Sequence, residues 1–129
     1  MQNDPLADAL TTIKNAEDSG KPECTLCPAS NIIASVLTVF KEQRYIEGFE
    51  YVDDGKAGFF RVKLTGRINR CGVVRPRYAV KLEGFERYEE RFLPSKNMGL
   101  LVVSTSKGVV PHFEAKRQGV GGQLLAYVF

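Results

Sequence analysis

Residues 99–129 read GLLVVSTSKGVVPHFEAKRQGVGGQLLAYVF, and the fold prediction depends mainly on this stretch. The apolar run 100–103 is short and is followed by turn-forming residues, which predicts a buried strand. Residues 104–108, Ser-Thr-Ser-Lys-Gly, leave the end of that strand. The final run 124–129 predicts a second buried strand, and the glycines at 119–122 can bend the backbone or admit another molecule closely. Small polar groups at two strand ends therefore indicate a docking surface.

The composition is that of a folded protein. The chain has 129 residues, of which 43% are hydrophobic, and this suits one core or two small ones. No apolar stretch reaches the roughly 20 residues that span a bilayer, and no basic segment precedes an apolar one at the amino terminus. We therefore expect a soluble, cytosolic protein with no membrane partner.

Charge is distributed unevenly along the chain. Residues 1–64 hold 7 Lys and Arg against 10 Asp and Glu, whereas residues 65–129 hold 11 against 5. The basic half contains a run of cations with no acidic residue between them: Arg67, Arg70, Arg75, Arg77 and Lys81. Such a run suits a polyanion, and we favour a nucleic acid over a solvated edge that only aids solubility.

The three cysteines do not form an obvious disulfide framework, because their number is odd and no secretory signal is present. Cys24 and Cys27 make a CxxC that could, with Cys71 and His112, supply zinc ligands. A zinc ribbon normally has a second closely spaced ligand pair, which Cys71 and His112 do not form. We therefore predict a reducing compartment, no metal and no cofactor.

The amino-terminal segment predicts a helix. Asp4 can cap free amides while Pro5 occupies the first turn, and the apolar residues that follow recur at helical spacing. The opposite face of this helix is polar and carries Thr11, Lys14 and Asn15.

The rest of the first half predicts a strand, a second helix and a hairpin. Residues 21–27 are a weak strand candidate, and Ser30 can cap a helix that carries an apolar stripe. Residues 49–52 then pair with residues 59–64 across a turn at 53–58.

The second half begins with a basic, glycine-punctuated crossing at residues 65–76. Residues 78–82 alternate as a strand does, and GFERYEERFLP at 84–94 predicts a short helix with its aromatic residues on one face. Glu89 and Glu90 are adjacent and therefore about 100° apart around the helix, so they do not share a site. We predict that both lie on a solvated helix face.

These elements predict an α+β fold of two small adjoining domains. Residues 1–64 form an amino-terminal α-β-α-β-β domain, and residues 65–129 form a mainly β domain with short helices. The chain has no GxGxxG, Walker loop, GxSxG or metalloprotease signature, and a single histidine offers little for base catalysis. We predict that the protein is not an enzyme and has no small-molecule substrate.

Several separated motifs resemble one family. STSKGVV at 104–110, EAKRQ at 114–118 and GVGGQLLAYVF at 119–129 resemble the carboxyl-terminal signature of the eighth small-subunit ribosomal protein family, S eight. DPLADALTTIKNAE at 4–17 and PAS at 28–30 resemble the same family, so the likeness spans nearly the whole chain. The middle segments INRCGVVRPRYAV and FERYEERFLP resemble its archaeal and eukaryotic branch.

The resemblance implies a function. Members are structural constituents of the ribosome that bind small-subunit ribosomal RNA early, hold an irregular stem of its central domain, and support assembly and translation. Cytoplasmic ribosomes and neighbouring small-subunit proteins are the implied location and partners, and the principal RNA contacts lie on the second domain. Repression of the protein's own messenger RNA stays open.

The resemblance also implies which residues contact RNA. At the carboxyl-terminal site the matching positions are Ser104, Thr105, Ser106, Lys107, Gly108, Gly121, Gly122 and Gln123. At a second backbone segment they are Thr11, Lys14, Asn15, Ser30 and Asn31. Independently of the resemblance, the charge pattern indicates that Arg75 and Arg77 of the basic run add attraction at longer range.

Physical reasoning agrees with the carboxyl-terminal assignment. Duplex RNA hides its base edges in a deep major groove, so contacts fall on the backbone, the 2′-hydroxyls and irregular bases. Short hydroxyls and bare amides suit such targets, and we expect Ser104 and Ser106 to matter more for specificity than Lys107.

Two positions depart from the family pattern. Pro111 stands where members commonly have Thr or Ser, so only Glu114 of a helix capping box remains. Gln123 stands where many bacterial members have glutamate, and this difference removes a negative charge near RNA.

A second function is compatible with the sequence. The alternative is a protein-interaction module whose basic face binds acidic partners.

Overall fold

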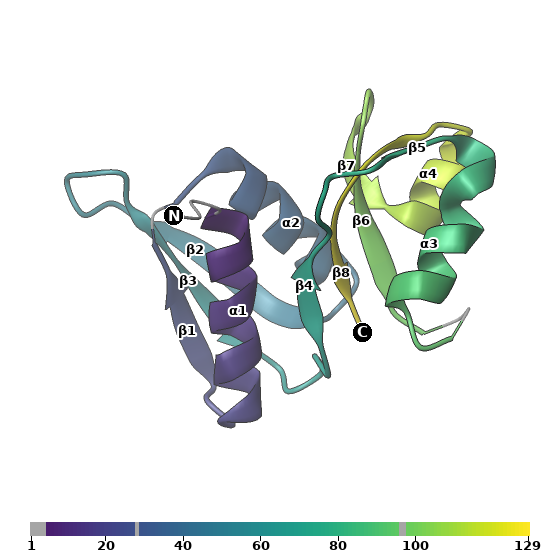
Figure 1. The fold of residues 1–129 in the computed structure, drawn as a ribbon. Coiled ribbons are helices and arrows are strands. Elements are labelled where there is room, and N and C mark those ends of the chain that lie inside the picture. Colours follow the sequence, from purple (N-terminus) through teal and green to yellow (C-terminus); the bar gives the residue numbers. More distant parts are fainter. Residues whose placement is uncertain (1–4, 28, 96–97) are drawn as a thin grey trace. The chain divides into compact units, whose positions relative to one another are not determined.

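The structure is a computed structural model that describes residues 5–27, 29–95 and 98–129. The chain divides into two compact units, Met1–Asn69 and Arg70–Phe129 (Figure 1). Within the described residues each unit has its own antiparallel sheet and two α-helices, which confirms the α+β class. No helix in the described ranges is long and apolar enough to cross a membrane.

Helices α1 (Pro5–Asp18) and α2 (Asn31–Glu42) of the first unit begin where the sequence predicted. Asp4, the predicted cap of α1, lies outside the described residues. The Ser30 hydroxyl accepts a hydrogen bond from the Ile33 amide at 3.4 Å, which confirms it as the cap of α2. Most apolar residues of both helices are buried.

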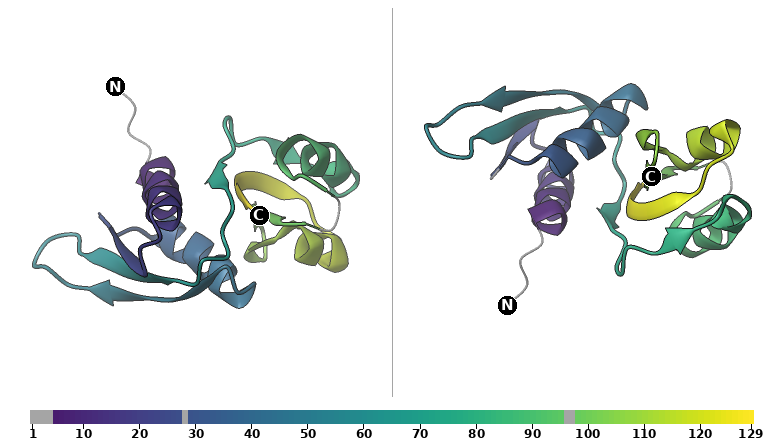
Figure 2. Two further views of the ribbon diagram at one scale, coloured as in Figure 1. Left: turned by 90° about the horizontal axis from the view of Figure 1, so that it is seen from below. Right: turned by 90° about the horizontal axis from the view of Figure 1, so that it is seen from above.

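The sheet of the first unit has the strand order β1-β3-β2, with β1 (Glu23–Leu26), β2 (Ile46–Val52) and β3 (Phe59–Leu64). The predicted hairpin is confirmed, although β2 begins at Ile46 rather than Phe49 because Ile46 pairs with Leu64. The apolar residues of β3 at 60, 62 and 64 are buried and alternate with more exposed ones. Helices α1 and α2 lie on the same side of the sheet (Figure 2). The exposed charged residues Glu50, Arg61 and Lys63 alternate with buried ones and therefore lie on the other face.

The sheet of the second unit contains five strands: β4 (Cys71–Val73), β5 (Ala79–Val80), β6 (Leu100–Thr105), β7 (Gly108–Pro111) and β8 (Gly122–Val128). Their order is β4-β8-β6-β7, and β5 also pairs with β8. The two buried strands predicted from the carboxyl-terminal stretch are confirmed as β6 and β8.

Several strand boundaries differ from the prediction. Strand β6 continues through Thr105, and β8 already begins at Gly122, because Ser104 pairs with Gln123 across the two strands. Strand β4 lies inside the segment predicted as a crossing, where it is held by pairing with β8 rather than by its own composition. The strand predicted at 78–82 is only two residues long, and a 3₁₀ turn, η1 (Leu82–Gly84), follows it.

Helices α3 (Phe85–Phe92) and α4 (His112–Gln118) pack on this sheet. The aromatic face of α3 contributes to the apolar core, as predicted. Pro111 occupies the N-cap position of α4 and provides no side-chain cap, and Glu114 instead accepts hydrogen bonds from Arg117. Gly119, with φ of 72°, ends the helix in the left-handed conformation that glycine adopts easily.

The prediction for Glu89 is wrong, whereas Glu90 is exposed as expected. Glu89 is only 6% exposed, and its two carboxylate oxygens contact His112 Nε2 at 2.9 Å and Lys116 Nζ at 2.7 Å. The amide of Leu101 on β6 donates to His112 Nδ1 at 3.0 Å. This network therefore connects α3, α4 and β6, and the charge of Glu89 is tolerated because both oxygens have donors.

The protonation states in this network follow from its geometry. Nδ1 of His112 accepts a hydrogen bond, so the ring is neutral and Nε2 donates to Glu89. Burial lowers the pKa of His112, and Glu89 only partly offsets the shift. Burial would raise the pKa of Glu89, but the hydrogen bond and charge of Lys116 help to hold it below its ordinary value.

Candidate nucleic-acid interface

The β6–β7 turn presents Ser106 and Lys107 at its tip. Thr105 pairs with Gly108, so only two residues connect the strands, and both are exposed. The Thr105 hydroxyl donates to the Gly108 carbonyl at 2.8 Å and accepts from the Lys107 amide at 3.1 Å. Thr105 thus stabilises the turn, while the Ser106 hydroxyl makes no hydrogen bond within the described part of the chain.

Strand register brings further predicted site residues to the same end of the sheet. Ser104 lies opposite Val109 on β7 and opposite Gln123 on β8, and Gln123 in turn lies opposite Ala79 on β5. Neighbouring strands are about 4.8 Å apart, so these residues form one row across the sheet. Ser104, Gln123 and the β6–β7 turn therefore form a continuous polar edge, which we call the sheet-end surface (residues 104–108 and 123).

Gly121 and Gly122 border this surface for a reason that lies within the protein. A Cβ at Gly121 would lie 2.3 Å from the carbonyl oxygen of Val80, and one at Gly122 would lie 2.3 Å from that of Ser104. Both glycines let neighbouring backbone approach closely. At Gly108 a Cβ would meet no atom within 4 Å, so the space beside the turn is open.

Arg75 and Arg77 lie on the other side of β8 from β6. They are exposed in the connection between β4 and β5, on either side of Pro76, and the Arg75–Pro76 peptide bond is cis. Both strands pair with β8. The predicted basic run is divided, because Arg67 belongs to the first compact unit and the other four cations belong to the second.

The remaining predicted site residues belong to the first unit. Thr11 and Asn15 are exposed on α1, and Lys14 between them donates to Asp18 at 3.1 Å. Their spacing places them on one helix face. The Ser30 hydroxyl is engaged as the α2 cap, and Asn31 is exposed in the first turn of that helix.

The cysteines and the histidine do not converge on a metal site. Within the described ranges no three His, Cys, Asp or Glu side chains form a metal-binding group. Burial, with Glu17 and Glu23 nearby, raises the pKa of Cys24 to about 11, and the thiolate is the form that binds metal. Both ring nitrogens of His112 are engaged within the protein.

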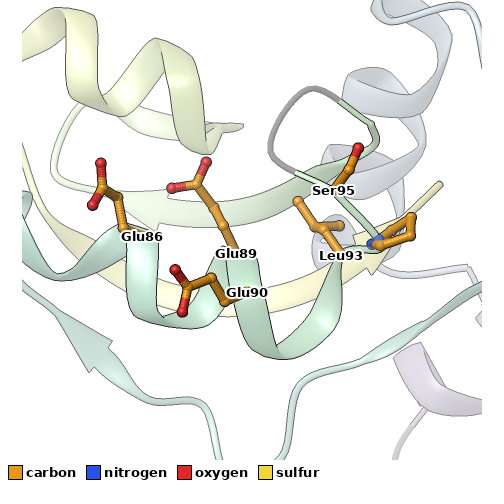
Figure 3. Close-up of a pocket in the computed structure, with 6 residues that line it drawn as sticks. Glu86, Glu89, Glu90, Leu93 and Ser95 are labelled. Carbon is orange, nitrogen blue, oxygen red and sulfur yellow. The ribbon is translucent and has the colours of Figure 1, made fainter.

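A pocket of about 230 Å³ lies beside α3 (Figure 3). Three glutamates contribute to its lining, at positions 86, 89 and 90, together with residues 93–95. Three carboxylates repel a phosphate backbone, so this pocket is unsuited to RNA.

Comparison with known proteins identifies the family. The family model described as Ribosomal protein S8 matches residues 4–129. The small ribosomal subunit protein uS8 of Methanococcoides burtonii is 55% identical over 98% of this chain and 97% of the relative. The protein of the same name from Haloarcula marismortui is 56% identical over 98% of both chains. These full-length archaeal relatives confirm the resemblance seen in the sequence, and the chain belongs to the ribosomal protein S8 family.

Proposed function

We propose that this protein is a structural constituent of the small ribosomal subunit and a primary binder of its ribosomal RNA. The full-length likeness to small-subunit proteins supports ribosomal membership. The RNA would be an irregular stem of the central domain, and the partners would include neighbouring small-subunit proteins. The role is structural and needs no catalysis, cofactor or metal.

The observation that carries the RNA contact is the sheet-end surface. It combines an exposed serine hydroxyl, a lysine, a glutamine amide and the open space beside Gly108. Hydroxyls and amides can both donate to and accept from 2′-hydroxyls and irregular bases, and Lys107 can pair with a phosphate. A rigid sheet end holds these groups in fixed register, which favours a defined RNA shape.

Electrostatics supports RNA on the second domain, residues 65–129. The exposed cations Arg75, Arg77 and Lys81 flank β5 in sequence, and β5 is the strand on which Ala79 pairs with Gln123. Such cations attract RNA at longer range and make the affinity depend on salt. The polar α1 face and Asn31 would contact a second backbone segment.

Copurification tests ribosomal membership. The native protein should stay with the small subunit in high salt, because hydrogen bonds to a defined stem are less salt-sensitive than phosphate contacts alone. Release at moderate salt, together with equal binding of random duplex, would instead favour the alternative of a basic module for acidic protein partners.

Ser106→Ala tests the surface itself. Filter binding to the central-domain stem should show a loss on the order of 1–3 kcal/mol, because a buried partner group in the RNA loses its hydrogen bond. Ser95→Ala is the matched control, since Ser95 is exposed in the same unit but lines the acidic pocket. Equal affinities for the two variants would contradict the proposed contact.

A further inference from the structure

The end of α2 contains an arginine where glycine is usual. The Tyr45 amide donates to the Phe40 carbonyl at 2.8 Å, and the Arg44 amide donates to the Lys41 carbonyl at 3.0 Å. This is the hydrogen-bond pattern of a helix that ends in a left-handed residue, and Arg44 has φ of 65°. An arginine in this left-handed conformation carries a steric cost in free energy that glycine would avoid. Backbone geometry alone would therefore favour glycine at position 44.

Residues distant in sequence meet around Arg44. Ile46 pairs with Leu64, and the Thr65 hydroxyl donates to the Tyr45 carbonyl at 3.2 Å. These contacts bring the segment after β3 to the end of α2. The two segments border an open hollow of about 410 Å³, which we call the basic hollow. Its lining residues are Lys41, Arg44, Ile46, Glu47, Thr65 and Arg67.

The three cations of the basic hollow outnumber its one carboxylate. Among the described residues, Lys41, Arg44 and Arg67 form no ion pair, and neither does the one carboxylate, Glu47. Elsewhere in the same unit Lys14 is paired with Asp18 at 3.1 Å. Residues 1–69 hold 8 Lys and Arg against 10 Asp and Glu, so three cations gather here against the net charge of their unit.

The positive charge continues beyond the hollow. A second hollow of about 270 Å³ shares Lys41 and Glu47 with the first and extends along β2 to Arg61 and Lys63. Arg61 is paired with Glu50 at 3.1 Å, whereas Lys63 forms no ion pair within the described residues. Because Glu50 also lines this second hollow, Lys63 is the cation that it adds without a paired carboxylate. Positive charge spread over two adjoining hollows suits a ligand with repeated negative charges better than a single carboxylate.

We propose that the basic hollow binds the phosphate backbone of RNA, as a contact of the first unit additional to its α1 face and to the sheet-end surface. The inference rests on the proposed function and names a further segment of the same ribosomal RNA as the ligand. Guanidinium groups grip phosphate oxygens with two hydrogen bonds, and Lys41 adds a point charge. A purely structural role is the competing explanation, because cations at a helix carboxyl end also stabilise the helix dipole.

Arg44→Gly separates these two explanations. Glycine relieves the left-handed strain, so the melting temperature should stay unchanged or rise, while affinity for a central-domain fragment of small-subunit RNA should fall roughly three- to tenfold. The slope of log affinity against log salt should become shallower by about 0.7–0.9. Lys41→Gln and Arg67→Gln should lower affinity similarly, and Glu47→Gln should raise it.

Lys56→Gln is the matched control, because Lys56 is an exposed cation of the same unit at the β2–β3 turn. If the variants of the hollow bind RNA no worse than this control, the proposal is overturned. A lower melting temperature of Arg44→Gly with unchanged RNA binding would also overturn it in favour of the helix-capping role.

The parent proposal is tested in the same assay. If the unaltered protein fails to prefer the central-domain fragment over random duplex, the proposed function fails and the basic hollow fails with it. If Ser106→Ala weakens binding while the variants of the hollow match Lys56→Gln, only the hollow is rejected. If polyglutamate displaces the bound RNA as effectively as competing RNA does, the hollow is not an RNA site.

Discussion

The sheets of the two units bury their strands differently. Strand β3 of the first unit alternates buried residues with charged ones, so that sheet exposes a whole charged face. Strand β6 of the second unit is buried at four consecutive residues, from Leu100 to Val103, each at most 2% exposed. Its polar groups therefore appear only where the strand ends, at Ser104 and beyond. The second unit is thus suited to a small surface of defined shape, and the first to a broader electrostatic one.

The largest effect should come from opening the tight sheet. Gly122→Ala places a Cβ against the Ser104 carbonyl, so β8 and β6 must move apart. We expect a loss of about 3 kcal/mol in the free energy of unfolding, measured by urea denaturation. In the first unit, Gly48→Ala is the matched control, because its Cβ would meet no atom within 4 Å. A loss of similar size at Gly48 would contradict the contrast between the two sheets.

A smaller loss should follow from breaking the network that connects α3, α4 and β6. Glu89→Ala leaves the His112 Nε2–H group without its partner and removes the acceptor of Lys116. We expect destabilisation by about 2–3 kcal/mol in thermal or urea unfolding. Glu90→Ala, one residue along the same helix but exposed, should change stability by less than about 0.5 kcal/mol.

Acid should weaken the second unit through the same network. The unfolded His112 binds a proton below its ordinary pKa of 6.5, whereas the folded ring resists protonation, so stability falls as pH drops below about 6.5. Glu89 adds a further loss below its ordinary pKa of 4.5, because its folded pKa is lowered.

The size of this pH effect can be bounded. The slope cannot exceed about 1.4 kcal/mol per pH unit for one proton. His112 is the only histidine in the chain, so His112→Gln should flatten the profile between pH 7.5 and 5.5 in urea unfolding. An unchanged profile would show that the folded and unfolded rings bind protons alike, which would contradict the lowered pKa of His112.

The sequence alone predicted the elements that carry strong local signals. The apolar periodicity of α1 and α2, the Ser30 cap and the β2–β3 hairpin all depend on residues close together in the chain. Strand β4 and the full lengths of β6 and β8 could not be predicted, because long-range pairing stabilises them. The aromatic face of α3 was predicted, but Glu89 was not, although it lies four residues after Phe85 and so on the same face.

The candidate site was only partly accessible from sequence. The resemblance supplied the residues of the sheet-end surface, and strand register explains why Ser104 and Gln123 adjoin. The resemblance did not explain why positions 121 and 122 are glycines. The structure explains it, because neighbouring backbone approaches both residues too closely for a Cβ. The basic hollow was not predicted, because Arg44 and Arg67 are separated by two strands in sequence and Arg67 had been grouped with cations of the other unit.

The central claim is that the sheet-end hydroxyls provide specificity and that the cations provide attraction. It is tested most directly by the ratio of affinities for the central-domain stem and for random RNA duplex, measured by filter binding across a salt series. Ser106→Ala should lower this ratio about 5- to 150-fold, whereas Lys107→Gln should weaken both RNAs alike and make the salt slope shallower by about 1. The claim would be contradicted if Ser106→Ala left the ratio unchanged while Lys107→Gln reduced it.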